Sequence, residues 1–485
     1  MNNFLSKNMF LNITNRLTIP YVILFIGCMS FFVSIRSIDY LNRDGVMYLI
    51  QAFHLNNNQS HIALEIFPYL SYARSIAFLQ NITQLTYLQS AHLLNSFLFT
   101  ITGIFFLLTC KVFVKGRYVL ISSALIFISS IPFFDSYLEM IIRDHAYITF
   151  LMISIFYLSK YFVEEKRYLY IIISLSSLGV ASLFRIESLF YLFVFASYFL
   201  VDKIYSVNIN LRSKKFNNKM ILLTSIFLIF IISFYGINNL NQIFFDLFQI
   251  LVTPIDLSSN NYWLAELIKD DNLKIKWSIL TFIFIIKLII LMGLLNIILL
   301  FLGIKYVYFS NIKLLAFLFL LTLIPPAINF LSTYVLSSRY LLSSLIICNI
   351  FSVIVLNSFF ENQIIIKKIK LLRVFIIAYI FICIAMILID SKKINYEKQL
   401  ALWFTMQNIN FNEVYSEDER VDYFMNRFMH ETHRQKFKDA LLDENIKYFL
   451  TYKPKFFINH KDFSIINLPD NYNHKKIQVF IRNKN

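Results

Sequence analysis

Long runs of hydrophobic residues recur along most of the chain and are separated by short polar stretches. A helix of about 18 to 20 apolar residues is long enough to cross the hydrocarbon core of a bilayer, where it satisfies its own backbone hydrogen bonds. The pattern therefore predicts a polytopic α-helical membrane protein with about eleven transmembrane helices. The predicted crossings are 19–36, 91–113, 117–134, 145–162, 168–184, 187–202, 219–236, 278–304, 312–331, 337–359 and 372–390.

One apolar stretch, 168–202, is too long to cross the membrane once. As a single helix it would extend about 52 Å, well beyond the thickness of the hydrocarbon core. The charged residues in its interior are Arg185 and Glu187. We therefore predict that the stretch is two crossings joined by a tight hairpin at these two residues.

The distribution of Lys and Arg orients the predicted crossings. With the N-terminus in the cytoplasm, most of the basic residues fall in cytoplasmic loops, as the positive-inside rule expects. A single crossing over 168–202 would invert every later loop and abolish this asymmetry. The odd number of crossings then places the C-terminus outside the cytoplasm.

Two parts of the chain are predicted to lie outside the membrane core. The first is a large outer loop at 37–89, inside the membrane module 1–390; its Leu, Ile, Phe and Tyr content favours amphipathic helices on the membrane face. The second is the polar segment 391–485, which we predict to be a small extracytoplasmic α/β domain. Within it, Tyr448–Tyr452 is rich in residues that favour a strand.

Composition agrees with a membrane protein. Hydrophobic residues make up 58% of the chain and charged residues 15%, more apolar surface than a soluble domain of this length buries. The net charge of +16 comes from loop residues, and no basic stripe interleaved with aromatics lies on a polar segment. The expected partners are therefore membrane lipids and not nucleic acid. Scattered cysteines argue against disulfides and zinc. The Asn, Ile, Lys, Phe and Tyr bias indicates an AT-rich, bacterial genome, so the expected location is a bacterial inner membrane.

Ionisable residues at the membrane boundary are costly and are candidates for function. On the predicted outer side they form four groups: Asp44 with Tyr48, Glu139 to His145 with Asp144, Arg185 with Glu187, and Arg339.

Each group also has a structural interpretation. Asp44 could be a solvated carboxylate or a helix N-cap, and the Arg143–Asp144 and Arg185–Glu187 pairs could be surface ion pairs. Arg339 could be an anchor at the membrane interface. His145 fits a hydrogen-bonded structural residue better than a metal ligand.

The order of these motifs resembles that of the GT-C glycosyltransferases. In that pattern a first span precedes a large outer loop that opens with an Asp, here Asp44, and a second outer Asp precedes the fourth span. Further similar motifs follow in the family's order: Phe67-Pro68-Tyr69, His92-Leu93-Leu94-Asn95, Ala181-Ser182-Leu183-Phe184-Arg185-Ile186-Glu187 and Ser338-Arg339-Tyr340-Leu341-Leu342.

The most similar group is the bacterial relatives of protein mannosyltransferases and lipid A aminoarabinose transferases, with the rhizobial lipopolysaccharide-core transferases. The resemblance covers residues 19–390. It departs from the family at Gly45, where many members have Glu, and at Ile186, where Pro is usual.

The resemblance implies a GT-C-like fold and an inverting glycosyltransferase. The donor would be a sugar on a polyprenyl phosphate, and the acceptor a lipid A or lipopolysaccharide, another glycan or a protein at the outer face of the inner membrane. No cofactor is evident, although Asp44 and Asp144 together could hold a divalent cation.

The family chemistry assigns roles to the candidate residues. Asp44 would be the general base that deprotonates the acceptor. The departing phosphate is already an anion and needs cations, for which Arg339, Arg185 and Arg74 are candidates. Asp144 and Glu187 would position the acceptor or hold the arginines, and Tyr48 would help to position the acceptor.

Two alternatives belong to other classes. A transporter or flippase of lipid-linked glycans would place charges within its spans and in broken helices; here Lys287 is the main charge inside a span. An O-antigen-type polymerase would have a large, arginine-rich late outer loop, whereas the loop before Arg339 is short.

Overall fold

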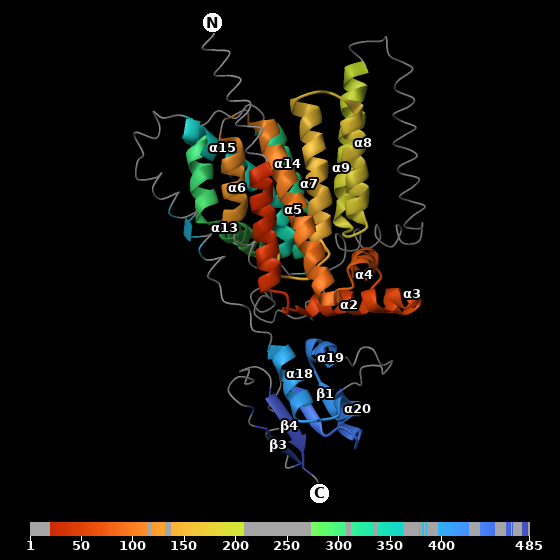
Figure 1. The fold of residues 1–485 in the computed structure, drawn as a ribbon. Helices are drawn as coiled ribbons and strands as arrows, with labels where there is room; N and C mark the ends of the chain where they lie inside the picture. The colour runs from red at the N-terminus through yellow and green to blue at the C-terminus, as the bar shows by residue number, and fades with distance from the viewer. Residues whose placement is uncertain are drawn as a thin grey trace. The chain divides into compact units, whose positions relative to one another are not determined.

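The computed structural model describes two compact units of one chain (Figure 1). The first unit contains Met1–Ser30, Phe97–Tyr137 and Arg143–Ile389, and the second contains Phe31–Ser96, Leu138–Ile142 and Asp390–Asn485. The described residues are 20–114, 116, 118–130, 137–207, 273–306, 312–333, 338–361, 378, 381–382, 385, 396–425, 437–451, 462–466, 468 and 478–483.

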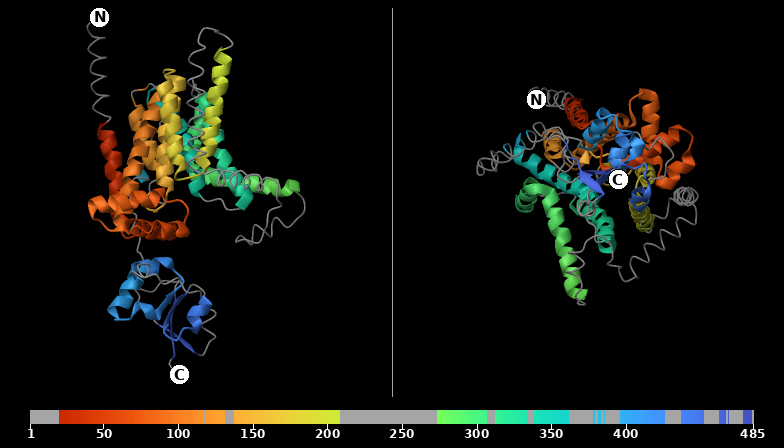
Figure 2. Two further views of the ribbon diagram at one scale, coloured as in Figure 1. Left: turned by 90° about the vertical axis from the view of Figure 1, so that its right-hand side faces the viewer. Right: turned by 90° about the horizontal axis from the view of Figure 1, so that it is seen from below.

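The first unit is a bundle of apolar helices. Neighbouring helices pack side by side in Figures 1 and 2, and hydroxyl groups join some of them. The Oγ atoms of Ser154 in α7 and Ser174 in α8 lie 2.8 Å apart. Small polar residues commonly form such hydrogen bonds where membrane helices approach closely. The helices are Pro20–Arg36, α5 (Tyr87–Phe113), α6 (Val119–Ser129), α7 (Asp144–Val163), α8 (Tyr168–Ser182), α9 (Glu187–Val207), α13 (Leu273–Tyr306), α14 (Ile312–Thr333), the 3-10 helix η2 (Ser338–Leu341) and α15 (Leu342–Glu361). The first two of these helices are shared with the second unit, which contains Phe31–Arg36 and Tyr87–Ser96.

Within the described residues, three helices are long and apolar enough to cross a membrane: Tyr87–Phe113, Asp144–Val163 and Ser338–Glu361. A bent helix makes a fourth if its two halves form one span. A mostly helical protein with a few membrane-capable helices is thus confirmed. The count of about eleven goes beyond this finding for two reasons. Five further apolar helices among the described residues have only 10–17 residues, and 219–236 and nearly all of 372–390 lie outside the described residues.

The predicted hairpin in 168–202 is present. Helix α8 ends at Ser182 and α9 begins at Glu187, and the two helices pack against each other. The four residues between them include Arg185, so the charge that indicated the break does lie in the turn.

The predicted crossing at 278–304 is interrupted by a sharp bend, so it is either a broken span or a re-entrant loop. Helix α13 bends by 102° between Phe282–Gly293 and Leu295–Phe301, and Figure 2 shows its first half lying across the direction of the other helices of the bundle. The cause is Gly293, whose φ of 72° and ψ of 160° suit a residue without a Cβ.

The second unit begins with three short helices in the predicted outer loop: α2 (Arg43–Asn56), α3 (Ser60–Ile66) and α4 (Ser71–Thr83). In α4, Tyr72 and Ile76 are buried while Arg74, Phe78 and Ile82 are exposed; the placement of these helices on the membrane face remains a prediction. Helices α2 and α4 pack together.

The short segment Leu138–Ile142 of the second unit is fastened by side chains. The Asn42 side chain accepts from the Ile141 backbone N–H at 2.7 Å and donates to its carbonyl at 3.4 Å. Asn95 donates to the Met140 carbonyl at 2.9 Å, and Arg36 pairs with buried Glu139 at 2.8 Å. A segment without regular structure thereby finds partners for its polar groups.

The C-terminal residues of the second unit form a small mixed sheet with helices, as predicted. The strand order is β1-β2-β4-β3; β1 and β2 are parallel, and the other two pairs are antiparallel. The predicted strand at Tyr448–Tyr452 is β2, in which Phe449 lies opposite Phe480 in the core. The elements are α18 (Tyr396–Met406), η3 (Phe411–Glu413), β1 (Val414–Ser416), α19 (Glu419–Phe424), α20 (Phe437–Leu442), β2 (Tyr448–Thr451), β3 (Phe463–Ile465) and β4 (Gln478–Arg482).

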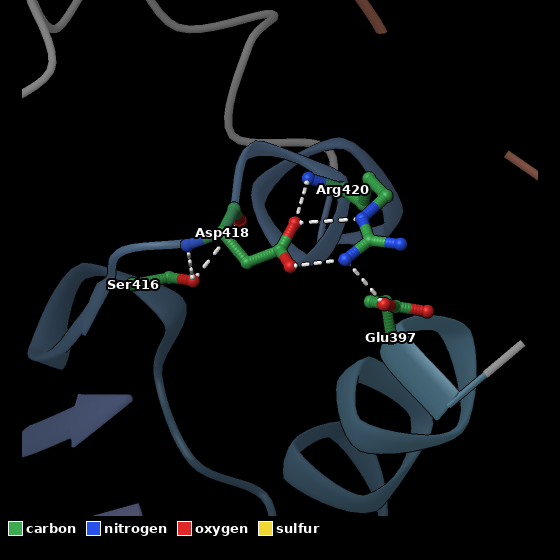
Figure 3. A network of polar contacts seen from close by, with 4 residues as sticks. All are labelled: Glu397, Ser416, Asp418 and Arg420. Atoms are coloured by element: carbon green, nitrogen blue, oxygen red, sulfur yellow. Dashed lines mark hydrogen bonds and ion pairs between the residues drawn. The ribbon is translucent and has the colours of Figure 1, made fainter. Parts of the chain in front are cut away.

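A polar network joins α18 to the start of α19 (Figure 3). Asp418 caps α19 by accepting from the Arg420 backbone N–H at 2.8 Å, and it also binds the Arg420 guanidinium through both carboxylate oxygens. The same guanidinium reaches Glu397 of α18 at 2.6 Å. Ser416 Oγ accepts from the Asp418 backbone N–H at 3.0 Å. These contacts have a structural role, because they hold helices together within this part of the unit.

Gly45 is needed because the fastened segment comes close to α2. A Cβ at Gly45 would lie 3.0 Å from the Ile141 Cβ and 2.8 Å from the Asn42 Oδ1. We expect Gly45→Ala to destabilise the protein by about 1–3 kcal/mol, as overpacking does, lowering its melting temperature in detergent. Gly27→Ala is the matched control, because its Cβ would meet only Thr100 at 3.7 Å. Equal melting temperatures for the two variants would contradict this account.

Candidate functional site

Arg185 is the centre of a buried ionic cluster in the first unit. It is 5% exposed, and its guanidinium donates to two carboxylates. Nε and Nη2 form a fork with Glu187 at 3.2 and 2.6 Å, and Nη1 donates to Asp144. Bidentate pairs of this kind fix the geometry of both partners.

Two tyrosine rings also contact the Arg185 guanidinium. Its Cζ lies 4.6 Å from the ring centroid of Tyr340 and 5.5 Å from that of Tyr147. Tyr340 belongs to η2, and Arg339 Cζ lies 5.5 Å from the same ring. We call Asp144, Tyr147, Arg185, Glu187 and Tyr340 the Arg185 cluster.

The local fold explains why the carboxylates stand where they do. Asp144 is the first residue of α7 and Glu187 is the first residue of α9. A negative charge at a helix N-terminus is favourable, because the unpaired N–H groups there carry partial positive charge. The α8–α9 turn then places Arg185 between the two helix starts.

Electrostatics keep Arg185 charged despite its burial. Burial by itself lowers the pKa of a guanidinium, but the adjacent Asp144 and Glu187 outweigh it and raise the pKa of Arg185 well above its ordinary value. The two carboxylates therefore favour the ionised guanidinium despite its burial. Removing one partner of such a buried pair strongly destabilises the protein, because the remaining charge is then buried without compensation.

The structure thus brings together three of the predicted site residues: Asp144, Arg185 and Glu187. Arg339 is linked to them through Tyr340, because the guanidinium groups of Arg185 and Arg339 both contact the ring of Tyr340.

The other predicted site residues belong to the second unit. Asp44 is in the first turn of α2 and is partly exposed. Tyr48 is 4% exposed and packs edge-on against Phe67 and Tyr72. Arg74 is exposed on α4. Their proposed roles remain predictions.

The possible divalent-cation site also remains a prediction, because Asp44 and Asp144 belong to different units. Among the described residues, no group of three or more His, Cys, Asp or Glu side chains could hold a metal ion. His145 is buried, and its ring lies 4.2 Å from that of Tyr137, centroid to centroid.

Sequence reasoning missed two features of these polar groups. Tyr340 lay in the Ser338–Leu342 motif, but only its neighbour Arg339 was assigned a role. The available signal was an aromatic residue beside an arginine at the membrane boundary, which favours a cation–π contact. The buried pair Arg36–Glu139 was not foreseen either. A cation at the end of the first apolar run and an acid at the start of the fourth were its only trace in the sequence.

Comparison with known proteins assigns no family. No family model matches the chain, and no curated protein matches it significantly. Function must therefore be argued from the residues themselves.

The contacts of the Arg185 cluster decide which chemistry its members can supply. The Nε and both terminal nitrogens of Arg185 donate to carboxylates. Arg185 is therefore better suited to fixing the positions of Asp144 and Glu187 than to binding a further anion. Asp144 and Glu187 are likewise engaged with Arg185. This arrangement favours a fixed scaffold with one further guanidinium, Arg339, at its side.

Removing the buried cation should be costly. We expect Arg185→Leu to lower stability by about 3–5 kcal/mol, because two carboxylates would lose their partner. Thermal unfolding in detergent measures the effect. Arg167→Leu is the control: Arg167 is 64% exposed and pairs with Glu165 at the surface, so its loss should cost about 0–1 kcal/mol. Similar melting temperatures for both variants would show that the cluster contributes little.

Proposed function

We propose that the protein is a membrane glycosyltransferase that moves a sugar from a polyprenyl-phosphate donor to an envelope acceptor. The acceptor is a lipid A or lipopolysaccharide, another glycan or a protein. The reaction takes place at the outer face of a bacterial inner membrane, with about eleven crossings of a GT-C-like fold, a cytoplasmic N-terminus and an extracytoplasmic C-terminus.

The observation that carries this proposal is the convergence of three distant motifs on the Arg185 cluster. The three motifs are Asp144, the Arg185-Ile186-Glu187 turn and the Arg339-Tyr340 pair. The two that lie nearest each other in the sequence, Asp144 and Arg185, are 41 residues apart. All three lie at the starts of helices or in a turn. Charges gathered at helix ends fit chemistry at the membrane boundary better than a path through the bilayer.

In the proposed reaction Asp44 accepts the proton of the acceptor hydroxyl or amine while its oxygen or nitrogen bonds to the anomeric carbon. The bond from that carbon to the phosphate oxygen breaks, and polyprenyl phosphate leaves with the electron pair. The partial exposure of Asp44 at the start of α2 supports this role. Arg339 binds the phosphate, with Arg74 as a further cation, while Asp144 and Glu187 hold Arg185.

One observation favours the alternative of a lipid-linked glycan transporter. The 102° bend of α13 at Gly293 is a broken helix, a feature that transporters use to line their binding sites. Reconstituted vesicles distinguish the two, because a transporter moves a labelled lipid-linked glycan across the bilayer without transferring its sugar.

The general base can be tested with a matched pair of aspartates. We expect Asp44→Asn to lower sugar transfer by about 100-fold to 10,000-fold, because the acceptor would keep its proton. The control is Asp39→Asn, since Asp39 is 37% exposed and pairs with Lys398; a surface pair contributes about 0–1 kcal/mol. Transfer is measured in membranes with matched protein levels. A wild-type rate of sugar transfer by Asp44→Asn would contradict the assignment of Asp44 as the general base.

The orientation has its own test. Alkaline phosphatase is active only outside the cytoplasm, so a fusion after Asp390 should be active. A fusion to the N-terminus should be inactive. The reverse result would overturn the odd number of crossings and the outer position of the reaction.

A further inference from the structure

The ring of Tyr340 contacts two guanidinium groups at once. Arg185 Cζ lies 4.6 Å from the ring centroid and Arg339 Cζ lies 5.5 Å from it. Like charges are not normally brought so near to one another, but an aromatic ring attracts each of them through its quadrupole. The two carboxylates on Arg185 also offset the repulsion.

The two arginines around this ring are not equivalent. Arg185 is bound by Asp144 and by both oxygens of Glu187, and it is buried. Arg339 is only partly buried. The first guanidinium is therefore a fixed part of the scaffold, whereas Arg339 keeps part of its surface exposed.

Asp144 and Glu187 are both engaged with Arg185. An anion is the ligand that complements a guanidinium such as that of Arg339.

The backbone that carries Tyr340 is held from the other side. Leu341, the last residue of η2, is fully buried and packs in a cluster with Leu288 and Leu291 of α13. Phe319 of α14 packs against the same cluster. Because this leucine anchors η2, the neighbouring Tyr340 and Arg339 start from a defined backbone position.

We propose that Tyr340 is a positioning residue: its ring aligns Arg339 against the fixed Arg185 and so defines a binding place for the phosphate of a polyprenyl phosphate. The proposal rests on the proposed function for the identity of this ligand. The attraction involves the face of the ring and not its hydroxyl, so phenylalanine should replace tyrosine here, whereas leucine should not.

The test compares binding of farnesyl phosphate and of farnesol, its uncharged counterpart, to the purified full-length protein in detergent. The wild type and Tyr340→Phe should bind farnesyl phosphate about tenfold or more tightly than farnesol. Tyr340→Leu should lose most of that preference while its farnesol affinity is unchanged. Tyr157→Leu is the control, because Tyr157 of α7 contacts the rings of Phe105 and Tyr170; it should keep the preference.

The outcomes are distinguishable. Equal binding of the two probes by the wild type, or an unchanged preference in Tyr340→Leu, overturns the proposal. An equal loss in Tyr340→Phe and Tyr340→Leu overturns the role of the ring. If Tyr340→Leu does not fold, Tyr340→Met and Arg339→Gln replace it, and both should lose the preference. A wild type that prefers farnesyl phosphate yet transfers no sugar would refute the proposed function alone.

Discussion

A buried guanidinium is the constraint on which the first unit depends. Taking Arg185 out of water costs several kcal/mol unless its donors are matched by carboxylates. That requirement explains the arrangement around it: Asp144 begins α7, Glu187 begins α9, and the turn between α8 and α9 holds the arginine between them. Tyr340 adds η2 to the same group. From its own turn, the Arg185 side chain thereby contacts the first residues of α7 and α9 as well as η2, which directly precedes α15.

The second unit solves a related problem with neutral groups. Leu138–Ile142 has no regular hydrogen-bond ladder, so its backbone takes partners from the side chains of Asn42 and Asn95. Asn95 also accepts from the Tyr72 hydroxyl at 2.6 Å, which links α4 to the same segment. The departure at Gly45 follows from this fastening. A residue with a side chain at Gly45 would press against the segment that the asparagines hold.

The sequence predicts the features that depend on local chemistry. Two charges inside a long apolar stretch located the hairpin at Arg185, and aromatic content located β2. Partners are harder, because helix periodicity gives the face of a residue but not which of several charges it meets. For Arg185 the sequence left a phosphate and the two carboxylates open as partners, and its contacts in the structure are with Asp144 and Glu187. The bend at Gly293 was missed, because one glycine within an apolar run fits a straight helix equally well by composition.

The bend of α13 bears on the choice between transferase and transporter. A broken helix serves as a binding site when its freed backbone groups face a cavity. Here the Met292 carbonyl at the break accepts from the Asn296 side chain at 2.8 Å, and Asn296 donates to Asn349 of α15 at 2.8 Å. Asn349 is fully buried and in turn reaches Ser130 at 3.3 Å. Since the Asn296 side chain already donates to this carbonyl and joins α13 to α15, the break is better explained by helix packing than by transport, and the charged cluster at the helix ends retains the stronger claim to function.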